Sequence, residues 1–400
     1  MDRALPIRPT DADMETTDAF AGLRCVDCGA THEQATHRCP DCGGTLDPIY
    51  DYDAVEATAA DLTAAPGEGL AAFALLLPFP AEHLVTAGEA ATPLIECPGL
   101  ADDLGVGAVY VKDEGASATG AFFDRGLALA VTAAREAGGT DVALPSMGND
   151  AQAAAAYAAR AGLASHSFVP SRTPFVNKAM INVHGGDMSV VGGRFADARE
   201  AFADAMADED WHSVAAFDTP YRHEGVKTLA YEIAADLDWT APDAVVHPTG
   251  HGTGLVGLQK GSRELAEMGL LDEHPRLYAA QASGCAPIAD AWAAGDDDPH
   301  VPEHPDTIVG PLEIPDPAGG RRALEAIAAS GGGAVATDDD EILEQAVTLA
   351  ETGVTVGPSC GAALSGARAL AADGTLGEDD VVVLVNANTG NKEADILRSH

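Results

Sequence analysis

The sequence predicts an α/β protein whose sheet is mostly parallel and is covered by helices on both faces. Short apolar runs of about five residues recur from residue 107 onward, and each indicates a buried strand. Helical stretches rich in alanine separate these runs. This alternation is typical of parallel sheets, because each crossover helix packs against one face of the sheet.

The expected elements follow one another in a regular order. The first strand is 109–112, and a helical stretch continues from it to Ala137. A strand at 141–145 then precedes an alanine-rich helix at 151–162. The remaining strands are expected at 165–170, 188–193, 213–217, 244–248, 276–282 and 381–385. The acidic, proline-containing stretch 296–306 predicts a surface loop, which is either a lid or a plain insertion.

The charge balance sets the expected surroundings of the chain. It carries 63 acidic and 22 basic residues, a formal net charge of -41. The acids are spread along the chain, which predicts a hydrated surface adapted to the cytoplasm of a salt-loving cell. Phosphate backbones would be repelled, so nucleic acid is not an expected partner. No run of 18 apolar residues and no signal peptide are present, so no membrane association is expected.

Two Cys-x-x-Cys pairs lie near the start of the chain, Cys25 with Cys28 and Cys39 with Cys42, and each is followed by glycine. Four thiolates at this spacing predict a closed, tetrahedral zinc site with a structural role. The chain has seven cysteines, so complete internal disulfide pairing is impossible, which favours a reducing cytoplasm. The alternative is a pair of disulfides or free thiols.

Four segments at strand-to-helix junctions carry the residues of a candidate site. They are 112–126, 146–149, 224–228 and 250–254. In the last of these, an apolar strand runs into a glycine-rich turn and then a helix. Backbone N–H groups of such a turn, beside a helix N-terminus, favour a phosphate dianion.

The candidate phosphate ligands in this turn are Gly250, Gly252, Thr253 and Gly254. The alternative is a turn that only packs a strand against a helix, because short glycine motifs are weakly specific. Asn149, at the start of the alanine-rich helix, is a second candidate for cofactor binding. Its alternative role is that of a helix N-cap.

The four segments, in this order, resemble the fold type II pyridoxal-phosphate (PLP) enzymes, and threonine synthases most closely. The resemblance runs from about residue 21 to the C-terminus, and the cysteine pairs are similar to those of archaeal threonine synthases. It implies a tryptophan synthase β-like fold with two parallel-sheet domains. It also implies that 250–254 holds the cofactor phosphate, that Asn149 lies against the ring hydroxyl, and that 224–228 lies near the site.

The resemblance breaks at the residue that matters most for the chemistry. The family reads Pro-Thr-Gly-Ser-Phe-Lys-Asp-Arg, and its lysine forms the Schiff base with PLP. Here Thr119-Gly120 and Asp124-Arg125 align without freedom and place Phe123 at the lysine position. Phenylalanine has no amine, so PLP is expected to be bound non-covalently if it is bound. The proton transfer that the lysine normally provides is also lost.

Another lysine could substitute, and the chain has five: Lys112, Lys178, Lys227, Lys260 and Lys392. Lys112 ends the strand before the site and is the best candidate by position. Its alternative role is an ion pair that balances Glu114, and Lys227 has a similar alternative at a helix start.

The domain boundaries expected from the sequence and the resemblance define four parts. They are a flexible arm at 1–20, a zinc knuckle at 21–52, a large domain at 53–129 and 221–400, and a small domain at 130–220. The cofactor cleft is expected between the two main domains.

Three functions are compatible with these residues. The first is a PLP enzyme of the threonine synthase type, which converts O-phosphohomoserine and water into threonine and phosphate. The second is a non-catalytic protein that binds a small phosphorylated amino acid or a similar anion, as a homodimer or paired with a homologue. The third is a PLP-independent enzyme with a remodelled cleft. Fold similarity does not choose among them, because function depends on the site.

Overall fold

The computed structural model describes residues 14–35, 37–55 and 57–397, and these residues group into two compact units. The first unit comprises residues up to Ala91 together with Phe123–Thr228. The second unit comprises Thr92–Phe122 and the residues from Leu229 onward. Each unit has its own sheet, and each is described separately below.

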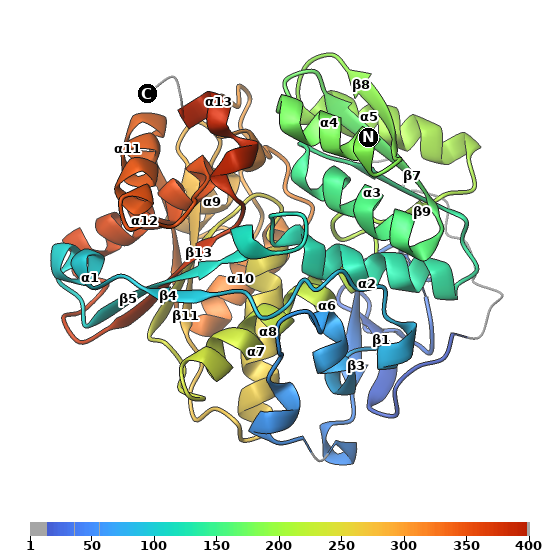
Figure 1. Ribbon diagram of the computed structural model, residues 1–400, viewed down its shortest axis with the longest axis horizontal. Helices are drawn as coiled ribbons and strands as arrows, with labels where there is room; N and C mark the ends of the chain where they lie inside the picture. The colour runs from blue at the N-terminus through green and yellow to red at the C-terminus, as the bar shows by residue number, and fades with distance from the viewer. Residues whose placement is uncertain (1–13, 36, 56, 398–400) are drawn as a thin grey trace. The chain divides into compact units, whose positions relative to one another are not determined.

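The second unit is built on a six-stranded sheet in the order β12-β11-β10-β13-β5-β4 (Figure 1). All neighbours are parallel except the edge strand β4, which runs antiparallel to β5. The strands are β4 (Leu94–Glu96), β5 (Ala108–Asp113), β10 (Ala244–Pro248), β11 (Arg276–Ala282), β12 (Gly333–Thr337) and β13 (Val381–Asn386). Parallel order requires crossover connections, which the helices of this unit supply.

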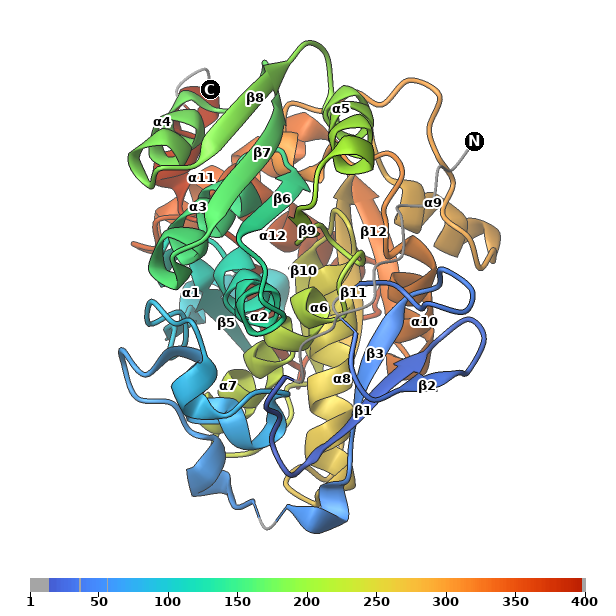
Figure 2. The same cartoon turned by 90° about the vertical axis from the view of Figure 1, so that its right-hand side faces the viewer.

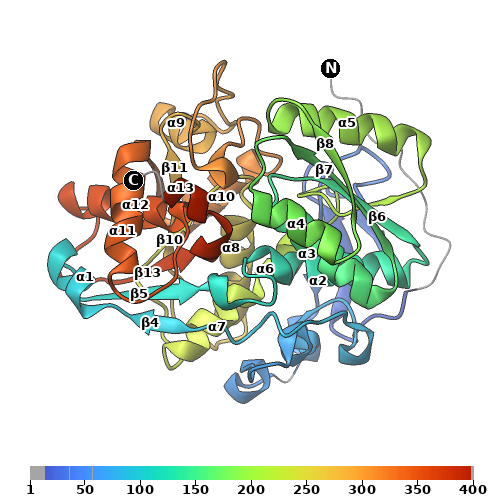
Figure 3. The same cartoon turned by 45° about the horizontal axis from the view of Figure 1, so that its top comes forward.

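Helices cover both faces of this sheet, as the views of Figures 1 and 3 show. Those on one face are α1 (Pro98–Leu104), α11 (Asp339–Ala350) and α12 (Pro358–Ala372). Those on the other face are α7 (Thr228–Asp236), α8 (Thr253–Glu267), α9 (Pro287–Ala294) and α10 (Gly320–Ser330). A short helix, α13 (Ala394–Leu397), lies beyond the last strand.

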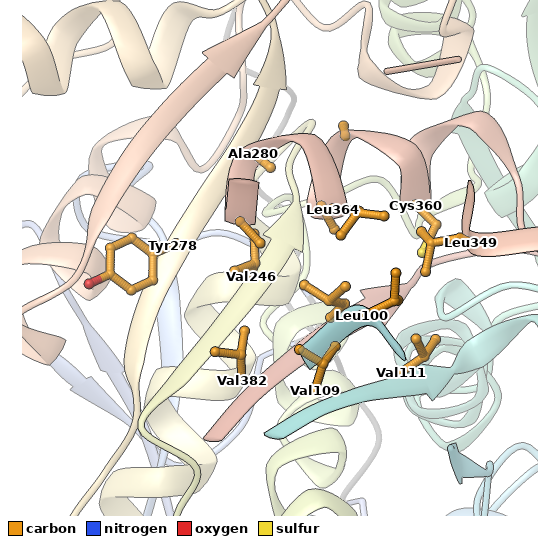
Figure 4. Packing of buried hydrophobic residues seen from close by; sticks show 14 of the residues in the cluster. Leu100, Val109, Val111, Val246, Tyr278, Ala280, Leu349, Cys360, Leu364 and Val382 are labelled. Carbon is orange, nitrogen blue, oxygen red and sulfur yellow. The ribbon is translucent and has the colours of Figure 1, made fainter. Parts of the chain in front are cut away.

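Alternate residues of each strand enter the two cores. In β13, Val382 and Leu384 join the cluster under α12, whereas Val383 and Val385 join the cluster under α8. Successive side chains of a strand point to opposite faces, so a sheet buried on both sides reads as a continuous apolar run. Figure 4 shows the first of these clusters, with Leu364 of α12 among the strand side chains.

The first unit contains a parallel four-stranded sheet in the order β8-β7-β6-β9, seen in Figure 2. The strands are β6 (Asp141–Pro145), β7 (Ala164–Pro170), β8 (Asp187–Val191) and β9 (His212–Ser213). The helices are α2 (Phe123–Glu136), α3 (Asn149–Ala161), α4 (Phe175–Val183), α5 (Phe195–Asp208) and α6 (Tyr221–Val226). Val169 of β7 packs toward α3, and its neighbour Phe168 makes an edge contact with Phe202 of α5. Both faces of this sheet are therefore covered.

The N-terminal part of the first unit is a small antiparallel sheet in the order β2-β1-β3. Its strands are β1 (Phe20–Cys25), β2 (Thr31–His32) and β3 (Leu46–Tyr50).

Short 3-10 turns occur in both units: η1 (Tyr52–Ala54), η2 (Ala59–Leu62), η3 (Gly69–Leu76), η4 (Ala81–His83), η5 (Glu114–Ala116), η6 (Gly310–Leu312) and η7 (Gly390–Lys392).

The predicted α/β class with parallel sheets is confirmed. The domain limits differ from the two observed units, because residues 53–91 and 123–129 group with the first unit. The segment before residue 92 packs on α2, where the Val85 N–H donates to the Thr132 hydroxyl. Residues 1–13 of the expected flexible arm lie outside the described residues. The rest of the arm is packed, since Met14 is buried and its N–H donates to Gln34.

None of the helices in the described part of the chain is long and apolar enough to cross a membrane.

Candidate functional site

The glycine-rich turn after β10 has a backbone that only glycine fits. Gly252 adopts a φ of +91°, and a Cβ at this position would lie 2.9 Å from the Cβ of Ala323. A Cβ on Gly254 would lie 2.1 Å from Nε2 of His247. Thr253 then begins α8, whose first N–H groups have no acceptor within the helix. The predicted residues Gly250, Gly252, Thr253 and Gly254 are thus brought together at a helix N-terminus.

His247 lies directly beneath this turn and was not singled out from the sequence. It is buried on β10, and its ring makes an edge contact with the Phe122 ring at 5.3 Å between centroids. Burial lowers the pKa of His247 to about 4, so the imidazole is neutral near pH 7. A polar residue inside the apolar run AVVHP is the signal that could have identified it.

Phe123 is the first residue of α2, and its side chain is partly buried. The guanidinium carbon of Arg222 lies 5.8 Å from the centroid of the Phe123 ring. Arg222 is itself buried and donates to the carbonyl oxygen of Val214. An arginine near an aromatic face is a favourable cation–π arrangement. The Phe123 ring is therefore packed against a buried residue of the first unit.

A glycine contact between α2 and α6 supports this arrangement. A Cβ on Gly126 would lie 2.5 Å from the carbonyl oxygen of Arg222, and one on Gly225 would lie 2.2 Å from that of Arg125. The side chain of Arg125 is buried and donates to the hydroxyl of Thr228 at 3.1 Å. The segments 112–126 and 224–228, which the sequence linked only by resemblance, therefore meet through backbone contacts that exclude larger residues.

Asn149 is the first residue of α3, and Gly148, with a φ of +133°, occupies the N-cap position. The alternative role of Asn149 as an N-cap is therefore wrong. Its side-chain oxygen accepts a hydrogen bond from Nδ2 of Asn177 at 3.0 Å. This hydrogen bond fixes the orientation of the Asn149 amide. A fixed amide is required if Asn149 is to contact a cofactor ring.

Lys112 is fully buried, and its amine is bonded to other groups of the second unit. Its Nζ donates to the carbonyl oxygen of Thr92 at 2.6 Å and lies 2.9 Å from Asp236 and 3.0 Å from Glu232. Lys112 thus forms ion pairs with two carboxylates of α7, whereas the sequence suggested Glu114 as its partner. Breaking a buried ion pair leaves an uncompensated charge, so these contacts favour the structural alternative for Lys112.

Lys227 is also held in a buried cluster, within the first unit. Its Nζ lies 2.5 Å from Glu224 and 4.0 Å from the ring centroid of Tyr50. The Tyr50 hydroxyl donates to the same carboxylate oxygen of Glu224 at 2.6 Å. Lys227 therefore connects the helix α6 to the strand β3.

The chain after β13 is hydrogen-bonded to the segment that leads into residue 123. The N–H of Thr389 donates to the carbonyl oxygen of Gly120, and the N–H of Phe122 donates to that of Ala387, each at 3.0 Å. Ala121 and Asn388 form an antiparallel bridge between these two bonds. These hydrogen bonds and the bridge define which residues of the C-terminal segment face 120–122.

A buried polar network continues from Asn388. Its side-chain oxygen accepts from the Ser359 hydroxyl at 2.6 Å, and its Nδ2 donates to Oε2 of Glu393 at 2.8 Å. Glu393 is buried, and its Oε1 has no hydrogen-bond partner among the described residues. Burial raises the pKa of Glu393 to about 7, against the opposing effects of Asn388 and the charge of Lys392. This carboxyl can therefore change its protonation state near neutral pH.

The four predicted metal ligands converge in the first unit. The sulfur atoms of Cys25, Cys28, Cys39 and Cys42 all lie within 4.8 Å of one another. The Cys25–Cys42 and Cys28–Cys39 sulfur distances are 3.5 and 3.8 Å. Sulfur atoms about 2.3 Å from a tetrahedral zinc would be about 3.8 Å apart, so the cluster has the dimensions of such a site. All four cysteines are free thiols, so the disulfide alternative is not supported.

The sheet that carries the cysteines is joined to α6. Besides the Tyr50–Glu224 bond, Nε2 of His223 lies 3.0 Å from Asp47 of β3. The Tyr221 hydroxyl donates to the carbonyl oxygen of Ala35, which lies between the two cysteine pairs. Three side chains of α6, those of Tyr221, His223 and Glu224, thus contact the cysteine-bearing segment. A change in the order of the knuckle is expected to reach α6.

Comparisons with known proteins place these features in a family. The model of the family described as pyridoxal-phosphate dependent enzyme matches residues 85–387, and the chain belongs to this family. A threonine synthase of Methanosarcina acetivorans is 36% identical over 91% of this chain and 90% of its own. A threonine synthase of Methanocaldococcus jannaschii is 34% identical over 93% of each chain. The threonine synthase resemblance predicted from the sequence is confirmed.

Solved structures confirm the fold type II architecture. A fungal L-serine ammonia-lyase from Rhizomucor miehei superposes with a TM-score of 0.68, at 21% identity over 78% of this chain and 97% of that chain. The processed form of threonine deaminase isoform 2 from Solanum lycopersicum gives 0.66, at 21% identity over 77% and 81% of the two chains. At this level of identity the similarity concerns the fold alone.

The residues present fit one part of the family cofactor and not another. The turn at 250–254 offers backbone N–H groups beside the α8 N-terminus, which suits the phosphate. Residue 123 offers a phenyl ring, which cannot form the covalent bond that a lysine makes there. The turn at 250–254 therefore has the features of an anion-binding element, and residue 123 carries no amine.

We expect one zinc ion per chain, bound by the four cysteines. Replacement Cys28→Ser should remove the metal, lower the thermal stability and increase amide hydrogen exchange in α6, because the knuckle sheet holds that helix. Elemental analysis and hydrogen-exchange mass spectrometry measure these changes. Cys285→Ala, at a buried cysteine outside the cluster, is the matched control and should keep its zinc. Full zinc content in Cys28→Ser would contradict this assignment.

The raised pKa of Glu393 predicts a specific pH dependence of stability. The ordinary value is 4.5, so between about pH 4.5 and 7 the folded protein keeps a proton that the unfolded chain loses. Stability contributed by this group is therefore lost as the pH rises through this window. Glu393→Gln should remove this loss, which amounts to roughly 1.4 kcal/mol per pH unit within the window.

Urea unfolding of both proteins at fixed salt, from pH 4.5 to 8, measures the effect. The buried His247 acts in the opposite direction, because its lowered pKa makes stability rise with pH up to about 6.5. It is present in both proteins, so the difference between them isolates Glu393. Parallel stability curves would show that this carboxyl titrates normally.

Proposed function

We propose that this protein is threonine synthase-like, that it binds PLP through the turn 250–254, and that its second ligand is a small phosphorylated amino acid. The observation that carries this proposal is the glycine turn, where side chains are excluded and backbone N–H groups are presented at a helix start. The reference reaction is the conversion of O-phosphohomoserine and water into threonine and phosphate.

In this proposal the residues have distinct tasks. The N–H groups of Gly252, Thr253 and Gly254 bind the dianion, and the α8 N-terminus stabilises its charge. Asn149, oriented by Asn177, faces the cofactor ring. The cysteine cluster holds structural zinc and has no role in the chemistry. When bound, PLP supplies the electron sink for reactions at an amino acid α-carbon.

Phe123 removes two functions that a lysine at this position would have. A phenyl ring neither forms a covalent bond with an aldehyde nor accepts a proton from the α-carbon of a substrate. Positioned proton transfer typically contributes 10²–10⁴-fold to a rate, so turnover by the usual route of the family is expected to be reduced by about this much. We therefore propose that residue 123 makes only non-covalent contact with the cofactor.

A non-catalytic role is the second candidate, and the contact between Phe123 and Arg222 favours it. The contact between the Phe123 ring and the buried arginine stabilises the present side chain at residue 123. Such a stable, non-reactive residue suits a protein that binds a ligand without converting it. Such a protein would act as a sensor, or as the inactive partner of a catalytic homologue. A PLP-independent enzyme would instead show no affinity for PLP, which separates it from both.

We expect Phe123→Lys to bind PLP covalently. The supporting residues Asp124, Arg125 and Gly126 keep their buried contacts, so the new amine enters a scaffold of the family type. PLP added to this variant should give a visible absorption band that borohydride abolishes, with the reduced adduct on residue 123. Threonine formation from O-phosphohomoserine should rise by about 10²-fold or more over wild type.

Phe123→Met is the matched control, because it also removes the phenyl ring but adds no amine. It should show neither the adduct at residue 123 nor the gain in threonine formation. A folded Phe123→Lys protein without an adduct at this position would contradict the placement of residue 123 in the cofactor site.

A further inference from the structure

The five lysines of the chain differ in what surrounds their amines. Lys112 is held by two carboxylates of α7, and Lys227 by Glu224 and the Tyr50 ring. Lys178 lies on α4, where its amine donates to the carbonyl oxygen of Ser171. Lys260 is buried in the middle of α8. The contacts just described for these four lysines involve no residue of the segment 119–122.

Lys392 is different, because its side chain reaches that segment. It closes the η7 turn and is buried, with 5% of its surface exposed. Its Cε lies 3.5 Å from the position that a Cβ on Gly120 would occupy. Gly120 has a φ of +78°, which favours glycine, and it stands three residues before Phe123. A primary amine is thus placed beside the chain that leads to the vacated lysine position.

This placement is fixed by the backbone. The hydrogen bonds Thr389 to Gly120 and Phe122 to Ala387 join the two segments on either side of the Ala121–Asn388 bridge. Lys392 follows Thr389 by only three residues, so its Cα cannot move far from Gly120. All of these residues belong to the second unit, together with the glycine turn at 250–254.

We propose that Lys392 supplies the primary amine that residue 123 lacks and forms the covalent bond to the PLP aldehyde. This inference rests on the proposed binding of PLP. The neutral amine adds to the aldehyde carbon, the carbon–oxygen double bond is replaced by a carbon–nitrogen double bond, and one water leaves with the aldehyde oxygen and both amine hydrogens. A lysine on a flexible four-carbon stem in a buried setting is suited to such a bond.

Glu393 is the neighbouring proton acceptor in this scheme. Its Oε1 has no hydrogen-bond partner among the described residues, whereas Oε2 is held by Asn388. A carboxylate on the adjacent residue of the chain can take the proton that an ammonium group must release before it reacts. If Lys392 had a structural role only, its charge would balance Glu393 and the amine would remain unmodified by PLP.

Borohydride reduction of the wild-type protein after addition of one equivalent of PLP tests the proposal. Peptide mapping by mass spectrometry is expected to find one phosphopyridoxyl group per chain, on Lys392. Lys392→Arg keeps the positive charge but cannot form the bond, so the yield of adduct should fall about tenfold or more. Lys178→Arg is the matched control at a lysine on α4 and should leave the yield unchanged.

The outcomes separate this inference from the proposed function. Equilibrium dialysis that shows bound PLP, with no reducible adduct or with the adduct on another lysine, overturns the role of Lys392 and leaves PLP binding intact. Absence of PLP binding overturns both. If Lys392→Arg fails to fold, the position of the adduct in the wild-type map alone decides.

Discussion

The account depends on one constraint: residue 123 is a phenylalanine, which has no nitrogen to bond with an aldehyde. Within the first unit, α2 and α6 meet at two glycines, and Arg125 is buried. We propose that a phenylalanine at residue 123 alters the chemistry of the site and leaves the fold that carries it unchanged.

The rest of the molecule supports binding of an anion. Glycine is required at the turn after β10 by sterics, and the His247 imidazole beneath it is neutral near pH 7 because it is buried. Three side chains of α6 contact the cysteine-bearing segment, so we expect metal binding to influence the order of the Arg222 region within one unit. At the other end of the chain, the side chain of Lys392 lies beside Gly120, and the carboxyl of Glu393 is hydrogen-bonded to Asn388.

Much of this could be predicted from the sequence. Strands that are buried on both faces of a sheet give continuous apolar runs, and these runs predict parallel strands. The cysteine spacing alone predicts a four-sulfur cluster. Partner identities could not be predicted, because they depend on tertiary placement. Lys112 pairs with carboxylates of α7, and Asn149 follows a glycine N-cap. Lys392 lies close to Gly120 because hydrogen bonds join two segments that are far apart in the sequence, and this pairing could not be predicted.

The most direct measurement is equilibrium binding of PLP and of pyridoxal, which lacks the phosphate, to the wild-type protein in high salt. The account predicts saturable binding of PLP at one site per chain and binding of pyridoxal that is weaker by about tenfold or more, because charge-assisted hydrogen bonds at 250–254 hold the dianion. Equal affinity for the two compounds, or no binding of either, would contradict it.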